Sequence, residues 1–204
     1  MNEEVELNKT EKEFKALKRR MKTTRQSRIE ASKRLRKNHS YFEKIIHFYS
    51  LIILILSVWF LNQSGEEGVF ATKILLVLSL SLTYFTMFLN LRNYKERAGD
   101  FETNYQHLDV LNNKFDRFES SDEQLDAEKL KEFQREYERL IIGKENHLNI
   151  DYYVSTEDNR KKFKKEVWVY RIKEGLIKSV LAIYPIVLLI IIYFFDKVIS
   201  KIHF

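Results

Sequence analysis

Three long apolar stretches interrupt a chain that is otherwise densely charged. They cover residues 45–61, 69–91 and 176–195. A bilayer core is about 30 Å thick, and a helix that rises 1.5 Å per residue needs about 20 apolar residues to cross it. The pattern therefore predicts three membrane-spanning helices. The first is slightly short, which bilayer thinning or snorkelling of Lys44 would accommodate.

The connection between the first two stretches, residues 62–68, is short, acidic and carries two glycines. A connection of this length allows only an antiparallel pair, so residues 45–91 are predicted to form a transmembrane hairpin. Residues 181–195 are apolar around almost the whole helix circumference, which favours lipid over the core of a soluble domain. Pro185 is compatible with a membrane helix because neighbouring helices can satisfy the freed carbonyl.

The polar regions also show helical spacing. Residues 1–44 are predicted to form a basic amphipathic helix, and residues 92–175 a helical domain without proline. In that domain two antiparallel helices would turn at residues 119–122, with a capping box of Ser121 and Gln124 starting the second. Their apolar stripes are Phe101, Tyr105, Leu108, Leu111, Phe115 and Phe118, then Leu130, Phe133, Tyr137, Leu140 and Ile141.

The predicted fold is therefore all-α: an integral membrane helical protein with a transmembrane hairpin, a cytoplasmic helical bundle and a third C-terminal transmembrane helix within residues 176–204. The distribution of basic residues sets its orientation. Residues 1–44 hold fourteen Lys or Arg and residues 92–175 hold seventeen, whereas residues 62–72 hold none. The positive-inside rule places both basic regions in the cytoplasm of a bacterial inner membrane and leaves the side of the C-terminal tail open.

A polar row follows one face of the second apolar stretch, and the first stretch carries a weaker one. One interpretation is the lining of a water-filled path formed when several hairpins assemble. The other is ordinary helix packing, because Ser and Thr are enriched at membrane helix contacts and can bond their own backbone. The candidate pore-lining residues are Ser79, Thr83, Thr86 and Asn90 in the second stretch, and Ser50 and Ser57 in the first.

Charge and chemistry narrow the possible functions. Neither of the first two stretches has an ionisable residue at its centre, which argues against a proton relay or a coupled transporter. Glu145, His147 and Asp151 lie close in sequence, but no second histidine stands at ligand spacing for a metal. The chain has no cysteine, phosphate loop or nucleophile motif. We therefore predict neither enzymatic activity nor a cofactor.

The basic cluster just before the first apolar stretch is predicted to bind anionic lipid headgroups. Nucleic-acid binding is disfavoured, because residues 15–37 lack aromatic side chains on which bases could stack. The predicted headgroup ligands are Lys33, Arg34, Arg36 and Lys37.

Three stretches carry a resemblance to a known family: residues 28–35 before the hairpin, residues 94–98 with 104–108 after it, and residues 137–152. Around the hairpin, in this order, they resemble the SLATT family of two-transmembrane domains associated with nucleotide-signalling systems of bacteria. The closest group is the one found beside reverse transcriptases. The motif residues in the helical domain are Arg97, Asn104, Tyr105, Glu145, Asn146, His147 and Asp151.

The resemblance implies a pore-forming effector of an antiviral or suicide system. Such a protein would assemble as a homo-oligomer and permeabilise the inner membrane when a partner triggers it, such as a reverse transcriptase or a nucleotide-signalling enzyme. The alternative is a non-conducting membrane anchor or scaffold that recruits a cytoplasmic partner through residues 92–175.

Overall fold

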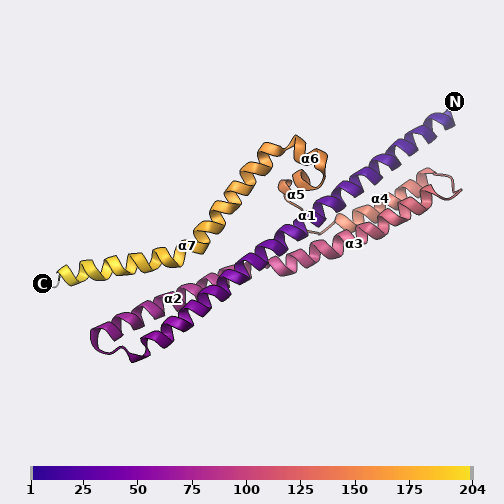
Figure 1. The fold of residues 1–204 in the computed structure, drawn as a ribbon. Coiled ribbons are helices and arrows are strands. Elements are labelled where there is room, and N and C mark those ends of the chain that lie inside the picture. The colour runs from indigo at the N-terminus through magenta and orange to yellow at the C-terminus, as the bar shows by residue number, and fades with distance from the viewer. Residues whose placement is uncertain (1, 203–204) are drawn as a thin grey trace. The chain divides into compact units, whose positions relative to one another are not determined.

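The structure is a computed structural model that describes the backbone of residues 2–202 and the side chains of residues 9–194 and 197. Every element of the described chain is helical (Figure 1), which confirms the all-α prediction. The elements are α1 (Asn2–Trp59), η1 (Phe60–Asn62), α2 (Gly65–Leu91), α3 (Tyr94–Glu119), α4 (Ala127–Ile141), α5 (Asn149–Val154), α6 (Glu157–Lys162) and α7 (Lys164–Ile202).

The chain forms two compact units, each assembled from separate stretches of sequence. The polar unit comprises residues 1–36 and 95–168, and the apolar unit comprises residues 37–94 and 169–204. The basic arm thus belongs to the same unit as the helical domain that follows the hairpin. Helix α1 continues from the arm into the first apolar stretch, because neither glycine nor proline interrupts residues 2–59.

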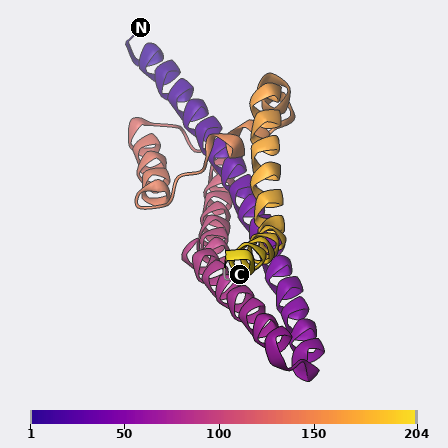
Figure 2. The ribbon, with the colours of Figure 1, turned by 90° about the vertical axis from the view of Figure 1, so that its left-hand side faces the viewer.

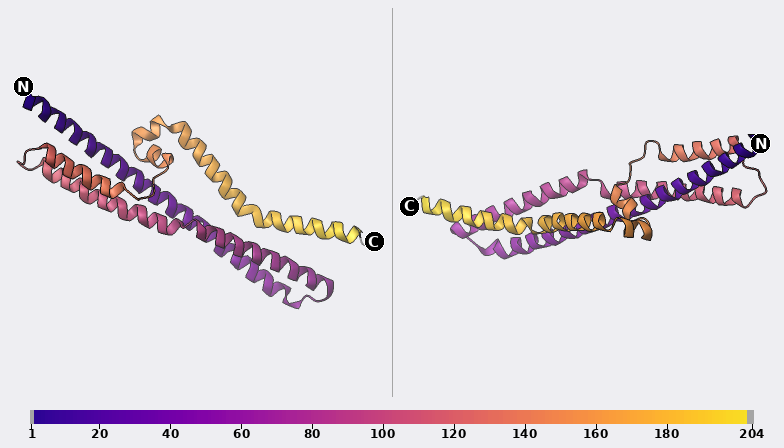
Figure 3. Two further views of the ribbon diagram at one scale, coloured as in Figure 1. Left: turned by 180° about the vertical axis from the view of Figure 1, so that it is seen from behind. Right: turned by 90° about the horizontal axis from the view of Figure 1, so that it is seen from above.

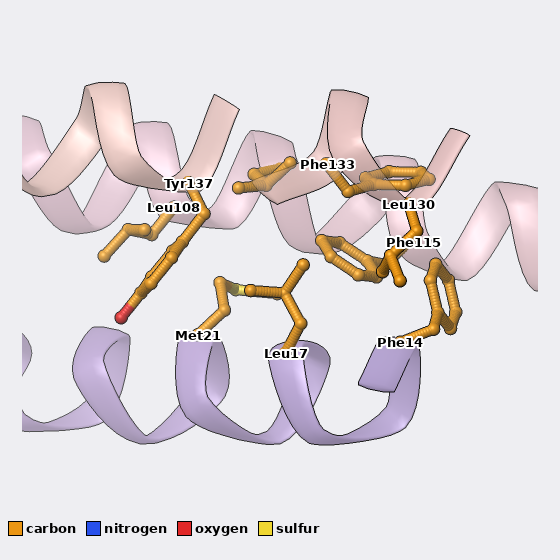
Figure 4. Packing of buried hydrophobic residues seen from close by; sticks show 9 residues of the cluster. Phe14, Leu17, Met21, Leu108, Phe115, Leu130, Phe133 and Tyr137 are labelled. Atoms are coloured by element: carbon orange, nitrogen blue, oxygen red, sulfur yellow. The ribbon is translucent and has the colours of Figure 1, made fainter. Parts of the chain in front are cut away.

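The core of the polar unit is a cluster of aromatic and aliphatic side chains from α1, α3 and α4 (Figure 4). Phe115 lies at its centre, with its ring centroid 4.9 Å from that of Phe14 and 4.3 Å from that of Phe133. Leu17 and Met21 of α1 complete the face that packs on the other two helices. Apolar residues of the two predicted stripes thus meet α1 in one core, although Phe101 and Tyr105 are not part of this cluster.

The start of α4 differs from the predicted one. Its N-cap is Asp126, whose carboxylate accepts a hydrogen bond of 2.7 Å from the backbone N–H of Lys129. The Ser121 hydroxyl instead donates to the carbonyl of Phe118 at the end of α3. The predicted capping box of Ser121 and Gln124 is therefore wrong. Figure 2 shows the two irregular connections that flank α4, residues 120–126 and 142–148.

In the apolar unit, α2 returns alongside the second part of α1 as an antiparallel hairpin (Figures 1 and 3). At both glycines of the connection, a larger residue would be sterically unfavourable. Gly65 has a φ of +68°, and a Cβ on Gly68 would lie 2.7 Å from the carbonyl oxygen of Gln63. At the other end of the hairpin, Phe42 of α1 packs with Phe85 and Leu89 of α2.

Helix α7 supplies the third apolar segment. It runs unbroken from Lys164 to Ile202 with Pro185 inside it, and it bends in its middle part (Figures 1 and 3). Proline removes one backbone donor and crowds the preceding turn, which accounts for a bend. Leu181 and Tyr184, just before the proline, pack against the cluster around Phe85. Helices α1, α2 and α7 each contain a segment long and apolar enough to cross a membrane.

Candidate functional site

The polar row of α2 lies beside the face that α2 buries in its own protomer. The buried residues of α2 are Ala71, Leu78, Phe85 and Leu89. At about 100° per residue, the row Ser79, Thr83, Thr86 and Asn90 is centred roughly a quarter turn from them. Thr83 and Asn90 are exposed, and Ser79 and Thr86 are half-buried. The structure therefore keeps the row on one face and leaves that face largely uncovered.

The hydroxyls of this row donate their protons to their own helix. Thr83 bonds the carbonyl of Ser79 at 2.8 Å, and Thr86 bonds that of Leu82 at 2.8 Å. Ser79 bonds the carbonyl of Leu76 at 3.0 Å. A hydroxyl that donates in this way still has acceptor lone pairs. The three hydroxyls therefore need no outside acceptor in lipid, yet they present oxygen atoms to whatever faces them.

Sequence reasoning missed one member of this face. Thr72 stands seven residues before Ser79, is exposed, and donates to the carbonyl of Gly68 at 2.8 Å. The seven-residue spacing could have revealed it. In the first stretch, Ser57 is half-buried and donates to the carbonyl of Ile53 at 2.7 Å, and Ser50 is also half-buried. Neither serine of the first stretch is exposed, whereas two of the four residues of the α2 row are.

Tyrosine hydroxyls join α7 to the hairpin, a feature that sequence reasoning did not find. Tyr41 of α1 donates to the carbonyl of Lys178 at 3.0 Å, and Tyr49 donates to that of Ala182. Ser81 of α2 bonds the hydroxyl of Tyr184 at 3.1 Å. Ser81 flanks the buried face of α2 on the side away from the Ser79–Thr83 row. Helix α7 is thus attached at three points just before the Pro185 bend.

The basic arm uses much of its charge inside the polar unit. Lys18 pairs with Asp116 at 2.6 Å, and Arg25 pairs with Asp109 at 2.6 Å. Further along α1, Ser32 donates to the carbonyl of Ala98 at 3.0 Å. As residue numbers rise along α1 they fall along α3, so these bonds form an antiparallel ladder. The ladder sets the register of α1 against α3.

Two of the four predicted headgroup ligands take part in similar pairs. Arg34 forms a bidentate pair with Asp151, and Arg36 pairs with Glu102. Lys33 is exposed and lies 2.9 Å from Glu30, and Lys37 is exposed. Lipid binding by this cluster stays a prediction, and Lys33, Arg36 and Lys37 are its exposed members.

The motif residues of the helical domain gather around the ends of α3 and α4. Arg97 forms a two-pronged pair with Glu145, with 2.8 Å between its Nε and one carboxylate oxygen. The buried Asn104 accepts a bond from Arg28 and donates to the carbonyl of Leu140 at 2.7 Å. Sequence reasoning did not predict this role of Arg28, which lies in the motif stretch of residues 28–35. Tyr105 and His147 are half-buried and Asn146 is exposed.

Two pKa shifts follow from this arrangement. Hydrogen bonds from Arg97 hold the pKa of Glu145 below its ordinary value, although burial opposes the shift. Burial lowers the pKa of His147, and the nearby positive charge of Arg28 adds to this effect while Asp151 opposes it. Near neutral pH, the lowered pKa values favour the charged form of Glu145 and the neutral form of His147.

Two of the three residues considered as metal ligands form ion pairs instead. Glu145 pairs with Arg97, and Asp151 pairs with Arg34. His147 lies between Glu145 and Asp151 in sequence. Among the side chains that the structure describes, no three potential ligands from His, Cys, Asp and Glu gather into a metal-binding group. The arrangement organises a helical bundle through charge-assisted bonds.

Three apolar helices of membrane-crossing length, joined to a charged helical unit, define an integral membrane helical protein. The chain belongs to the SMODS and SLOG-associating 2TM effector domain family 5, whose model matches residues 10–195. This confirms the SLATT resemblance, and the chain carries a two-transmembrane effector domain of a family associated with conflict systems. The match includes most of α7. No curated protein and no solved structure matches the chain.

Proposed function

We propose that this protein is a membrane effector of a bacterial defence system, which assembles as a homo-oligomer and permeabilises the inner membrane when triggered. It performs no covalent chemistry. The polar unit lies in the cytoplasm, as the distribution of basic residues indicates. There it holds protomers together or in check and receives the signal from a partner of the system.

One observation supports this proposal: the hydroxyl row of α2 lies beside the buried face of the helix and is left largely uncovered by its own protomer. An isolated hairpin in lipid gains little from such a row, because its apolar neighbours suit lipid better. In an assembly of several protomers, the row can face a shared water-filled path or another helix. The absence of an ionisable side chain at the centre of α2 fits a weakly selective conduit better than a pump.

Dye release from liposomes tests the proposal directly. The purified protein is reconstituted at increasing protein-to-lipid ratios into vesicles loaded with a self-quenched dye. If several protomers form one conduit, release rises more steeply than in proportion to protein density. The double variant Thr83→Leu with Thr86→Leu should reduce release about tenfold, because it replaces two row hydroxyls by apolar side chains.

A matched control changes the exposed lipid-facing side of the same helix. Val77→Leu with Leu80→Ile keeps the apolar character and should leave release unchanged. Equal release by wild type and the Thr83/Thr86 variant would remove the row from the mechanism. If no release occurs at any density while a cytoplasmic protein co-purifies with the chain, the non-conducting scaffold becomes the better account.

Orientation has a separate test, because the chain contains no cysteine. Single substitutions Gln63→Cys in the hairpin connection and Asn113→Cys on the exposed face of α3 provide two labelling sites. A membrane-impermeant maleimide applied to intact spheroplasts should label the first site and not the second. Labelling of Asn113→Cys in intact spheroplasts would contradict the proposed orientation.

A further inference from the structure

The segment that precedes α7 is held in the polar unit by few apolar contacts. From residue 142 to residue 163, all of which the structure describes, Ile150 is the only apolar residue that is fully buried. Tyr152 and Tyr153 contact the ring of Phe163, but these contacts lie within the segment itself. The remaining attachment to the rest of the unit is largely polar.

The principal polar attachment is the ion pair between Arg34 of α1 and Asp151 of α5. The Asp151 side chain is only 1% exposed, and its two oxygens accept from Arg34 Nε at 2.7 Å and from Arg34 Nη2 at 3.0 Å. The same carboxylate accepts the backbone N–H of Leu148 at 2.9 Å. One buried carboxylate thus joins α1, α5 and the connection before α5. Arg97 and Glu145 add a second, more exposed pair.

Buried polar atoms near this pair lack partners. Arg28 Nε and His147 Nδ1 make no hydrogen bond to any described residue. A buried polar atom without a partner disfavours the closed packing, because water would satisfy it once the segment separated. The segment is therefore held by charge that can be hydrated on release, whereas the Phe115 core would expose mainly apolar surface.

We propose that the Arg34–Asp151 pair is a latch that keeps the effector in its resting state. Chain connectivity carries its effect: α5 leads through α6 into Lys164, the first residue of α7, and α7 continues as one helix into the apolar unit. Opening the latch frees residues 142–163 and thereby releases the start of a membrane helix. This inference rests on the proposed permeabilising function and assigns its regulation.

The test compares Asp151→Asn with a matched control, Asp109→Asn. Both remove one carboxylate that pairs with an arginine of α1, but Asp109 belongs to the partly exposed pair with Arg25. Backbone hydrogen exchange and dye release are measured on the same reconstituted preparations, with no trigger added. Asp151→Asn should accelerate exchange within residues 142–163 at least tenfold, leave α3 and α4 protected, and raise dye release several-fold. Asp109→Asn should do neither.

Further variants separate the possible failures. The swap of Arg34→Asp with Asp151→Arg should restore slow exchange and low release in part, because an arginine at 151 cannot accept the N–H of Leu148. Arg34→Lys keeps the charge but loses the two-pronged contact, so it should give intermediate values. It replaces Asp151→Asn as the test variant if Asp151→Asn does not fold. Unchanged exchange in Asp151→Asn overturns the latch. Faster exchange without dye release overturns its regulatory role if wild type releases dye at high density. If wild type releases none at any density, the permeabilising function itself has failed.

Discussion

The polar and apolar units are both built from α-helices, but different interactions hold their helices together. In the polar unit, α1 buries an apolar stripe and matches many of its basic side chains to acids of α3 and α5. In the apolar unit, large side chains such as Leu54 and Leu80 remain more than half exposed, and the bonds that join the helices come from tyrosine and serine hydroxyls. Water drives the association of the first unit, whereas lipid is as apolar as the helices of the second. The difference explains why charge organises one unit and sparse hydroxyl contacts organise the other.

The largest expected effect comes from the aromatic core of the polar unit. Phe115→Ala should destabilise that unit by about 3–5 kcal/mol, because it removes a fully buried ring and leaves a cavity. Hydrogen exchange of α3 and α4 in detergent measures the loss. Phe48→Ala, at a side chain exposed to lipid in the apolar unit, is the control and should leave that exchange unchanged. Equal effects of the two substitutions would erase the distinction between the units.

A smaller loss is expected from the buried amide of the polar unit. Asn104→Leu removes the acceptor of Arg28 and the donor to Leu140, and should cost about 1–3 kcal/mol because Arg28 stays buried with one partner fewer. The free energy of unfolding is measured by chemical denaturation, with the hydrogen exchange of α3 as the signal. Asn113→Leu, on the exposed side of the same helix, should be nearly neutral. A neutral Asn104→Leu would show that this amide contributes nothing to the stability of the polar unit.

The hydroxyl contacts of α7 should contribute less. Tyr41→Phe with Tyr49→Phe removes two bonds to α7 and should lower its attachment by about 1–2 kcal/mol, since hydrogen bonds between membrane helices are individually weak. The attachment of α7 is measured by heating the protein in detergent and finding the temperature at which α7 becomes susceptible to proteolysis. Tyr84→Phe serves as control because Tyr84 is exposed. If the double tyrosine substitution lowered stability as much as Phe115→Ala, hydroxyl bonds would not be the weak contacts expected in the apolar unit.

Acidification should loosen the polar unit by the smallest amount. The pKa of His147 is lowered in the folded state, so below its unfolded value of about 6.5 the unfolded chain binds the proton first and stability falls. The pKa of Glu145 is also lowered, and its contribution is lost at still lower pH, below its unfolded value of about 4.3. Exchange within residues 142–163, compared at pH 7 and pH 5.5, should rise in wild type and less in His147→Gln. The exposed His107 provides the control substitution, His107→Gln. Slower exchange at pH 5.5 than at pH 7 would contradict this prediction, because it would mean that acid stabilises the polar unit.

Local patterns were sufficient for the membrane segments and for the helix stripes. The hairpin connection of seven residues left only one arrangement, and the structure has it. The start of α4 was missed because Ser121 and Asp126 both suit an N-cap, and the choice between them depends on where α3 ends. The internal ion pairs of the basic arm were missed for a related reason. Arg34 and Asp151 are 117 positions apart, so no spacing along the chain could show that this arginine already has a partner.

The sequence alone determined that this protein is helical, that it has three apolar segments of membrane-crossing length, and that it belongs among the SLATT effectors. The first two properties depend on composition and on the 3.6-residue period, both of which are local. The third depends on the ordered motif stretches and is confirmed by the family match over residues 10–195. Only the tertiary structure decided that the arm and the later helices form one unit, that Arg34 and Arg36 pair internally, and that tyrosines attach α7. Those results depend on contacts between residues distant in sequence, whose partners are selected by packing.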